Sequence, residues 1–381
     1  MEISFGNCQE SNDLWEFPIG DFLVLARPDV SGLYILNPSA RLIWEIHKSG
    51  AQLPELVREF ASAYNIPRDV AAQDVERTVG EWQSGLLSRH RSSLSLAPIL
   101  ASSPASSNVE FFAQNYVVHG MNIRVILQTS QLAEEIAPRL ESLPNKPSAP
   151  DFVFRVVEDT DGFRIFRDQC CVAMEESIGE IRGVLLQEIV RSCRGRDPLA
   201  IFHAGACGSN SRCVVFPAST QSGKTTLAAV LMKTGLTFYG DDSVLLERDT
   251  LSIPVMPFAL TVRDGSWDVL NPRFPTLKNA PIVSRFGQRV RFLPLAEEKQ
   301  DGYCEGVAAI VFARFDRDSP NEVAELDALQ TLLRLQESGF WVEHDEQSIR
   351  ALLAWVRSTP SFTMSYSEVD QAASVIRGFV G

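Results

Sequence analysis

The feature that most constrains the fold of this chain is a strand, a loop and a helix in direct succession, followed by a second strand that ends in two acidic residues. Cys213–Phe216 is an apolar, β-branched run that predicts a buried strand, and 217–222 is small, polar turn sequence. A helix is predicted from Lys224, and a second strand over 236–239, directly before Gly240 and the acidic pair. This order is typical of α/β domains, which collect ligands at the carboxyl ends of their strands.

The loop between this first strand and the helix has the composition of a phosphate-binding turn. Backbone N–H groups and the positive end of the helix dipole face a phosphate there, while Lys224 adds a charge and Thr225 a hydroxyl ligand for Mg²⁺. The usual motif begins with glycine, whereas Ala218 and Gln221 carry Cβ atoms that restrict positive φ angles. We predict a site for ATP with Mg²⁺. It comprises Ala218, Ser219, Thr220, Gln221, Ser222, Gly223, Lys224, Thr225 and Thr226.

Asp241 and Asp242 follow the second strand, where α/β sheets bind their ligands. One carboxylate can position Mg²⁺ while the other accepts the proton of an attacking hydroxyl. We predict that both are catalytic, with Thr225 and Asp242 as the metal-binding residues. A solvated turn is the alternative for an isolated acidic pair.

The spacing of these motifs resembles the bacterial HPr serine kinase/phosphorylase family. His203 lies 21 residues before Lys224, and Asp241 lies 17 residues after it. The resemblance implies that Lys224 and Thr225 contact the phosphates and Mg²⁺, that the two acids are catalytic, and that His203 is an active-site histidine. Ala218 and Gln221 replace family glycines, and Thr226 stands where true HPr kinases have glutamate. The replaced glycines bear on nucleotide affinity, and Thr226 in place of glutamate predicts a divergent branch of the family.

A small module is predicted over residues 1–90. Phe22–Ala26 and Leu33–Leu36 are short apolar runs separated by turn residues, which predicts a hairpin. Asn37 and Pro38 then open the first of three amphipathic helices, an arrangement typical of winged helices. Residues 1–95 hold 8 basic and 13 acidic side chains, which argues against DNA binding. Trp44 and Trp82 are predicted to be core residues.

This module resembles the PqqD-like family over about residues 15–90, in the hairpin, the Asn-Pro step and Trp44. Members of that family bind the leader of a ribosomally synthesised precursor peptide. The resemblance implies that a leader strand pairs with the exposed hairpin edge, at Ser31, Leu33, Tyr34 and Ile35, since an unpaired edge offers a row of N–H and C=O groups. A purely structural module is the alternative.

Residues 91–108 are rich in serine and nearly free of charge, which predicts a flexible tether. The remaining 109–381 are predicted to form one α/β P-loop kinase domain of the HPr kinase type, preceded by the small winged-helix PqqD-like α+β domain. Downstream of the acids, Arg263, Arg289 and Arg291 are candidate phosphate contacts. A solvated basic surface is the alternative for each arginine.

Composition narrows the range of partners and compartments. A net charge of −13 opposes broad binding of nucleic acid or anionic membrane, because such partners require positive charge. The seven cysteines show no metal-binding spacing, and the N-terminus has no signal sequence, so we expect reduced thiols and a cytoplasmic location. The HPr kinase resemblance also favours self-association into a homo-oligomer.

These features together predict an ATP-dependent serine kinase that phosphorylates a ribosomally synthesised precursor peptide, for example in lasso-peptide-type maturation. Serine as the acceptor is implied by the family resemblance alone. Two alternatives stay open: a nucleotide-gated peptide chaperone without catalysis, and a nucleotidyl transferase or small-molecule phosphotransferase on the same site.

Overall fold

The computed structural model describes residues 14–28, 30–84, 86, 110–218, 222–285, 287–295, 301–318 and 321–381. The chain divides into two compact units. The first combines residues up to Ser95 with Glu343–Leu353, and the second contains the rest. The prediction assigned all of 109–381 to one domain, so the grouping of Glu343–Leu353 with the N-terminal unit differs from it. The predicted tether lies outside the described residues.

The N-terminal unit is a three-stranded antiparallel sheet followed by three helices. Asn37 caps the first helix by accepting a hydrogen bond from the Ala40 N–H at 2.8 Å. Trp44 and Trp82 are buried and meet edge to face with ring centroids 5.3 Å apart, so both are core residues. The elements are β1 (Trp15–Ile19), β2 (Phe22–Arg27), β3 (Val30–Leu36), α1 (Pro38–Lys48), α2 (Leu53–Tyr64) and α3 (Arg68–Ser84).

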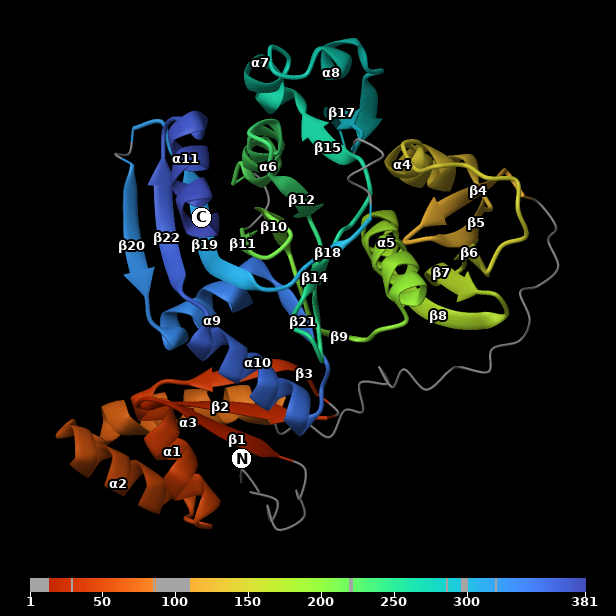
Figure 1. Ribbon diagram of the computed structural model, residues 1–381. Helices are drawn as coiled ribbons and strands as arrows, with labels where there is room; N and C mark the ends of the chain where they lie inside the picture. The colour runs from red at the N-terminus through yellow and green to blue at the C-terminus, as the bar shows by residue number, and fades with distance from the viewer. Residues whose placement is uncertain are drawn as a thin grey trace. The chain divides into compact units, whose positions relative to one another are not determined.

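The second unit begins with a five-stranded sheet in the order β4-β5-β6-β7-β8, hereafter the accessory sheet. Two helices cover one face of it (Figure 1) and form a shared core with side chains such as Ile136, Leu185 and Phe154. Its elements are β4 (Phe112–Val118), β5 (Met121–Leu127), α4 (Ser130–Leu140), β6 (Phe152–Asp159), β7 (Gly162–Arg167), β8 (Cys170–Glu175) and α5 (Ile178–Arg194).

A six-stranded mixed sheet in the order β12-β10-β11-β19-β22-β20 forms the centre of the second unit. β11, β19 and β22 run parallel, so their carboxyl ends meet at one edge. Helices α6 and α11 pack together against this sheet (Figure 1) and bury Leu227, Val230 and Ile376. The elements are β10 (Ala204–Gly208), β11 (Cys213–Pro217), α6 (Lys224–Lys233), β12 (Thr237–Gly240), β19 (Val307–Phe315), β20 (Glu322–Leu326), β22 (Ser361–Tyr366) and α11 (Val369–Val380).

Three smaller sheets complete the second unit, with strand orders β13-β9-β21, β15-β17-β16 and β14-β18. Most of the remaining helices are short connections, and α10 is divided between the two units. The bounds are β9 (Pro198–Phe202), β13 (Val244–Glu247), β14 (Ile253–Pro254), β15 (Leu260–Arg263), η2 (Asp264–Ser266), α7 (Trp267–Leu270), α8 (Pro275–Asn279), β16 (Val283–Arg285), β17 (Gln288–Leu293), β18 (Tyr303–Cys304), α9 (Ala328–Ser338), β21 (Phe340–Val342) and α10 (Glu346–Ser358).

Two element predictions differ from the structure for local reasons. The apolar pattern of 117–127 by itself predicts one strand, but the segment is a hairpin, because His119 and Gly120 both adopt positive φ angles, 46° and 77°, and turn the chain. The sequence pattern of 325–338 predicts a helix over the whole segment, but the helix begins only after Asp327, whose side chain forms a capping box with Gln330. The residues before Asp327 pair with β22 as the edge strand β20.

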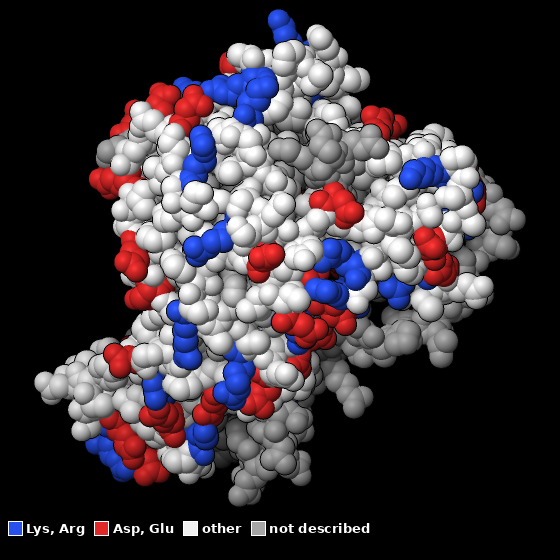
Figure 2. Space-filling view, in the orientation of Figure 1, with Lys and Arg blue, Asp and Glu red and all other residues white. Residues whose placement is uncertain are grey.

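The surface carries mixed charge. On the face shown in Figure 2, basic and acidic side chains of the described residues are interspersed. Among the helices that the structure describes, none is long and apolar enough to cross a membrane.

Candidate functional site

A polar cluster lies at the carboxyl end of β11, where the chain turns into α6. Gly223 precedes the helix with a φ of 92°, and a Cβ at this position would lie 2.7 Å from the Tyr366 hydroxyl. Only glycine fits this turn without strain. Lys224, the first residue of α6, is therefore held against the end of the sheet, where its side chain is 7% exposed.

The Lys224 ammonium contacts three groups. Its Nζ atom lies 2.8 Å from His203 Nε2, 3.1 Å from the Ala218 carbonyl oxygen and 3.7 Å from Asp242 Oδ1. His203 Nδ1 lies 3.3 Å from the Ser338 carbonyl oxygen, so Nδ1 donates and Nε2 accepts from Lys224. Burial lowers the pKa of Lys224, helped by the charge of Arg263 and opposed by the two acids.

The two acids differ sharply in environment. Asp241 is buried, and its Oδ2 atom accepts a 2.7 Å hydrogen bond from the Thr225 hydroxyl. Its Oδ1 atom is also buried and has no hydrogen-bond partner among the described residues. Burial and the neighbouring Asp242 charge raise the pKa of Asp241 to about 6.

Asp242 is half exposed and adopts a left-handed backbone conformation with φ 68°. Burial raises the pKa of Asp242, but the nearby His203 ring, with Nε2 3.8 Å from Oδ1, and the charges of Lys224 and Arg139 outweigh that effect and leave it below its usual range. Asp242 is therefore ionised at neutral pH, while Asp241 is the acid that holds a proton more readily.

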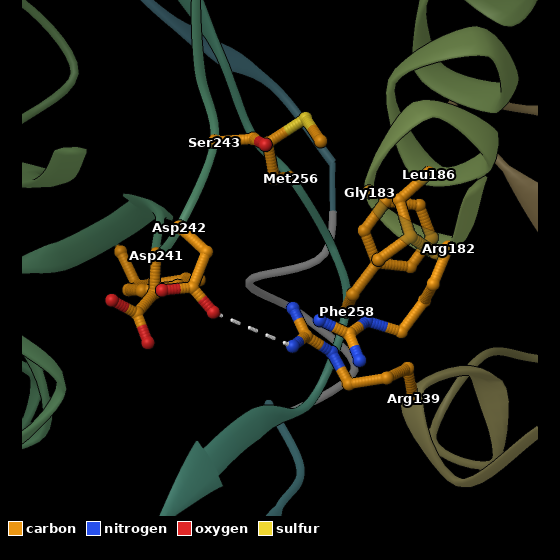
Figure 3. Close-up of a pocket in the computed structure, with 10 residues that line it drawn as sticks. Arg139, Arg182, Gly183, Leu186, Asp241, Asp242, Ser243, Met256 and Phe258 are labelled. Atoms are coloured by element: carbon orange, nitrogen blue, oxygen red, sulfur yellow. Dashed lines mark ion pairs between the residues drawn. The ribbon is translucent and has the colours of Figure 1, made fainter. Parts of the chain in front are cut away.

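Arg139 comes from the end of α4 in the accessory sheet layer and was not predicted as a site residue. Its side chain is 6% exposed, Nη1 donates to the Thr261 hydroxyl at 2.9 Å, and Nη1 lies 4.0 Å from Asp242 Oδ2. Figure 3 shows the guanidinium pointing toward the Asp242 carboxylate. Nε is buried and has no partner among the described residues. Burial lowers the pKa of Arg139, while both acids oppose the shift.

A small cavity separates Arg139 from the acidic pair (Figure 3). Its volume of about 30 Å³ suffices for an ordered water that satisfies buried polar atoms. The cavity lies between helices α4 and α5, which cover the accessory sheet, and the residues at the end of β12. Its walls are Arg139, Arg182, Gly183, Leu186, Phe238, Asp241, Asp242, Ser243, Met256 and Phe258.

The other predicted nucleotide residues are placed in different ways. Thr226 follows Thr225 in α6, and its hydroxyl lies 2.6 Å from Ser266 Oγ. Ser222 Oγ is buried without a hydrogen-bond partner among the described residues. Ser219, Thr220 and Gln221 lie outside the described residues.

The three downstream arginines separate onto two faces of one β-ribbon. Arg263 on β15 is the register partner of Val290 on β17, so Arg289 and Arg291 point to the opposite face. Their guanidinium carbons lie 5.1 Å and 4.2 Å from the centroid of the Trp267 ring. The structure therefore brings Arg263 toward Lys224, whereas Arg289 and Arg291 form cation–π contacts on the other face.

A second, larger cavity of about 430 Å³ lies in the N-terminal unit, between β3 and helices α1 and α3. We call it the β3–α3 groove. Of the four predicted peptide-binding residues, Tyr34 and Ile35 line it and the Leu33 side chain is buried. Ser31 lies in β3, an edge strand of its sheet. The groove is lined by Tyr34, Ile35, Leu36, Asn37, Ser39, Ala40, Ile43, Phe60, Asp74, Arg77, Thr78, Glu81 and Trp82.

Comparison with known structures gives a weak likeness for part of the chain. The HPr(Ser) kinase/phosphatase from Coxiella burnetii superposes on 47% of this chain and 87% of its own length, with 10% identity and a TM-score of 0.26. A likeness this low carries no argument about fold or function. Comparison with curated proteins gives no match.

Comparison with protein families gives one match in the N-terminal unit. The family model described as coenzyme PQQ synthesis protein D (PqqD) matches residues 23–85. These residues cover β2 and β3 and all three helices, with the groove between them. Residues 23–85 of this chain therefore form a PqqD-like domain.

Proposed function

We propose that this protein is an ATP-dependent kinase that phosphorylates a serine of a ribosomally synthesised precursor peptide, whose leader binds the PqqD-like domain. One observation supports the kinase activity above all others. Lys224, His203 and Asp242 meet at the carboxyl end of β11, within 4 Å of one another through Lys224 Nζ, His203 Nε2 and Asp242 Oδ1. A cluster of this kind suits the positioning and charge neutralisation that phosphoryl transfer needs.

The β11–α6 turn is the proposed phosphate site. The N–H groups at the start of α6 and the Lys224 ammonium provide positive charge where the terminal phosphates would lie. Gly223 allows the backbone to approach closely, because Tyr366 leaves no room for a side chain. To bind phosphate, Lys224 must exchange its hydrogen bond to the Ala218 carbonyl for phosphate oxygens. Its hydrogen bond to His203 Nε2 is retained and keeps the ammonium in position.

Thr225 and Asp241 fit a magnesium ion. Mg²⁺ prefers oxygen ligands, and Asp241 Oδ1 is a buried carboxylate oxygen without a hydrogen-bond partner among the described residues. When bound, Mg²⁺ would neutralise charge on the transferring and leaving phosphates. The sequence prediction paired Thr225 with Asp242. The Thr225 hydroxyl contacts Asp241 instead, so we assign Asp241 to the metal.

We assign Asp242 as the general base for the acceptor serine. It is half exposed and ionised at neutral pH, so it can accept a hydrogen bond from an incoming serine hydroxyl. The serine oxygen forms a bond to the γ-phosphorus, the bond from that phosphorus to the leaving ADP oxygen breaks, and the hydroxyl proton passes to Asp242. Lys224 and Arg139 flank this carboxylate and hold it in place.

The leader is proposed to bind along β3 and the β3–α3 groove. β3 is an edge strand, so an extended peptide can add to it through main-chain hydrogen bonds. The groove is lined in part by Tyr34, Ile43 and Phe60, which would contact apolar side chains of the leader. A bound leader raises the effective concentration of the acceptor segment at the kinase site.

The test is transfer of label from γ-labelled ATP to synthetic peptides that correspond to short reading frames beside the gene, with Mg²⁺ present. The proposal predicts label on a peptide hydroxyl, and loss of that label in Lys224→Ala with peptide binding retained. Label from α-labelled ATP would indicate a nucleotidyl transferase instead. Binding of ATP and peptide without any transfer would indicate a nucleotide-gated chaperone.

A further inference from the structure

The two sides of the β11–α6 turn offer different chemistry. On one side β10 and β12 lead to the acidic pair, and on the other β19 and β22 run parallel to β11. If the terminal phosphate faces Asp242, the rest of a nucleotide must extend away from the acids. The carboxyl ends of β19 and β22 lie in that direction, at the edge where parallel sheets bind ligands.

Two aromatic residues end these strands side by side. Phe315 on β19 and Tyr366 on β22 are register partners, and their rings meet edge to face with centroids 5.6 Å apart. Tyr366 is 2% exposed, whereas Phe315 is 43% exposed. Tyr366 therefore braces the Phe315 ring, and much of that ring faces solvent.

Phe315 also contacts the turn itself. Its backbone N–H lies 3.4 Å from the Ser222 carbonyl oxygen, and its Cβ atom lies 3.5 Å from where a side chain on Gly223 would begin. Single exposed apolar residues are common and need no special explanation. This one differs because its backbone contacts the proposed phosphate site, and its ring packs on Tyr366, whose hydroxyl lies at the same turn.

We infer that Phe315, braced by Tyr366, is the platform on which the base of the nucleotide stacks. This inference rests on the proposed function. The nucleotide then extends from the ends of β19 and β22, across Gly223, to the acidic pair. Every nucleobase has an aromatic face, so Phe315 provides affinity for the base as a class, separately from the phosphate contacts of Lys224.

The test compares ATP with inorganic tripolyphosphate, which has the phosphates but no base. Equilibrium binding is measured for the full chain, with Phe315→Ala, Phe315→Trp and Lys224→Ala as variants. Stacking on one aromatic residue predicts that Phe315→Ala weakens ATP binding about tenfold and leaves tripolyphosphate binding unchanged. Phe315→Trp should restore ATP affinity, and ATP but not tripolyphosphate should quench the new indole fluorescence. Lys224→Ala should weaken both ligands.

The outcomes separate the two proposals. Unchanged ATP affinity in Phe315→Ala, or an equal loss for ATP and tripolyphosphate, would overturn the base platform while a Lys224 effect would keep the kinase proposal. A folded wild-type protein that binds neither ligand would overturn both. Because Phe315 is partly exposed, its truncation should leave the fold intact, and circular dichroism of each variant checks this.

Discussion

The cluster around Lys224 and the β3–α3 groove use opposite kinds of physics. In the cluster, Lys224, Arg139 and Asp241 are almost fully buried, and Arg139 and Asp241 each have a buried polar atom without a hydrogen-bond partner among the described residues. In the groove, the charges of Arg77 and Asp74 are exposed and pair with each other at 2.8 Å, and the lining mixes polar side chains with apolar ones such as Ile43 and Phe60. Buried charges concentrate the interaction energy with a ligand in a few atoms, whereas a groove spreads it over many weaker contacts. The difference separates a site suited to chemistry from one suited to recognition.

Among the substitutions that test the cluster and the groove separately, Asp242→Asn should have the largest effect, which is on the rate of phosphoryl transfer. The amide keeps the shape of the side chain but cannot accept the acceptor proton, so the transfer rate should fall by about 10²–10⁴-fold. Affinity for ATP and for the leader should stay near wild type, because neither contact uses this carboxylate as a base. Single-turnover transfer with labelled ATP measures the rate, and a near-normal rate would remove Asp242 from the mechanism.

Arg139→Gln should have the next largest effect, because Asp242 loses one of the cations that hold it. We expect the transfer rate to fall about tenfold, which corresponds to ~1.4 kcal/mol of transition-state stabilisation. Arg139→Lys should recover part of the rate. Arg182→Gln is the matched control, since Arg182 lines the same cavity but pairs with Glu135 at 3.3 Å. Equal losses in both glutamine variants would mean that the cavity, and not the Arg139 charge, is responsible.

Thr78→Asp tests the groove separately from the cluster. A carboxylate at the half-buried Thr78 of α3, which lines the groove, should weaken leader binding about tenfold, as typical of a substitution at an important interface residue, without changing ATP affinity. Val70→Asp adds the same charge to an exposed α3 position outside the groove and serves as control. Fluorescence anisotropy with a labelled leader peptide measures the affinity. Equal weakening by the two variants would point to net charge instead of the groove.

The smallest expected effect is on stability, through Asp241. Its pKa is raised from 3.8 to about 6 in the folded state, so between these values the unfolded chain loses its proton first. The free energy of unfolding therefore falls as pH rises through this window, and the contribution of Asp241 to it is constant above about pH 6. Asp241→Asn should stabilise the protein at pH 8 by about 1–3 kcal/mol and have little effect at pH 4. Urea unfolding at both pH values measures this, and stabilisation confined to pH 4 would contradict the assignment.

Local patterns in the sequence were sufficient for most of the elements near the cluster. The strand before the turn, the helix from Lys224 and the strand before the acids occur where the apolar runs predict them. The PqqD resemblance is confirmed for residues 23–85. The predicted roles of Lys224, His203 and the two acids stay predictions, although the structure brings these residues together.

Tertiary structure decided what no local pattern contains. The sequence shows Arg139 only as an arginine after a proline at a helix end, and its position beside Asp242 depends on how the accessory sheet packs against the central sheet. Strand register turned Arg289 and Arg291 away from Arg263 and made Phe315 a neighbour of Tyr366. The choice of Asp241 over Asp242 as the partner of Thr225 likewise follows from the backbone conformation after β12.

The sequence by itself determined the local elements, because hydrophobic period, glycine and capping residues act within a few positions of each other. It also determined which residue types were available for phosphate and metal chemistry. Which of those side chains meet was decided by sheet order and register, since a shift of one residue along a strand reverses the face to which a side chain points.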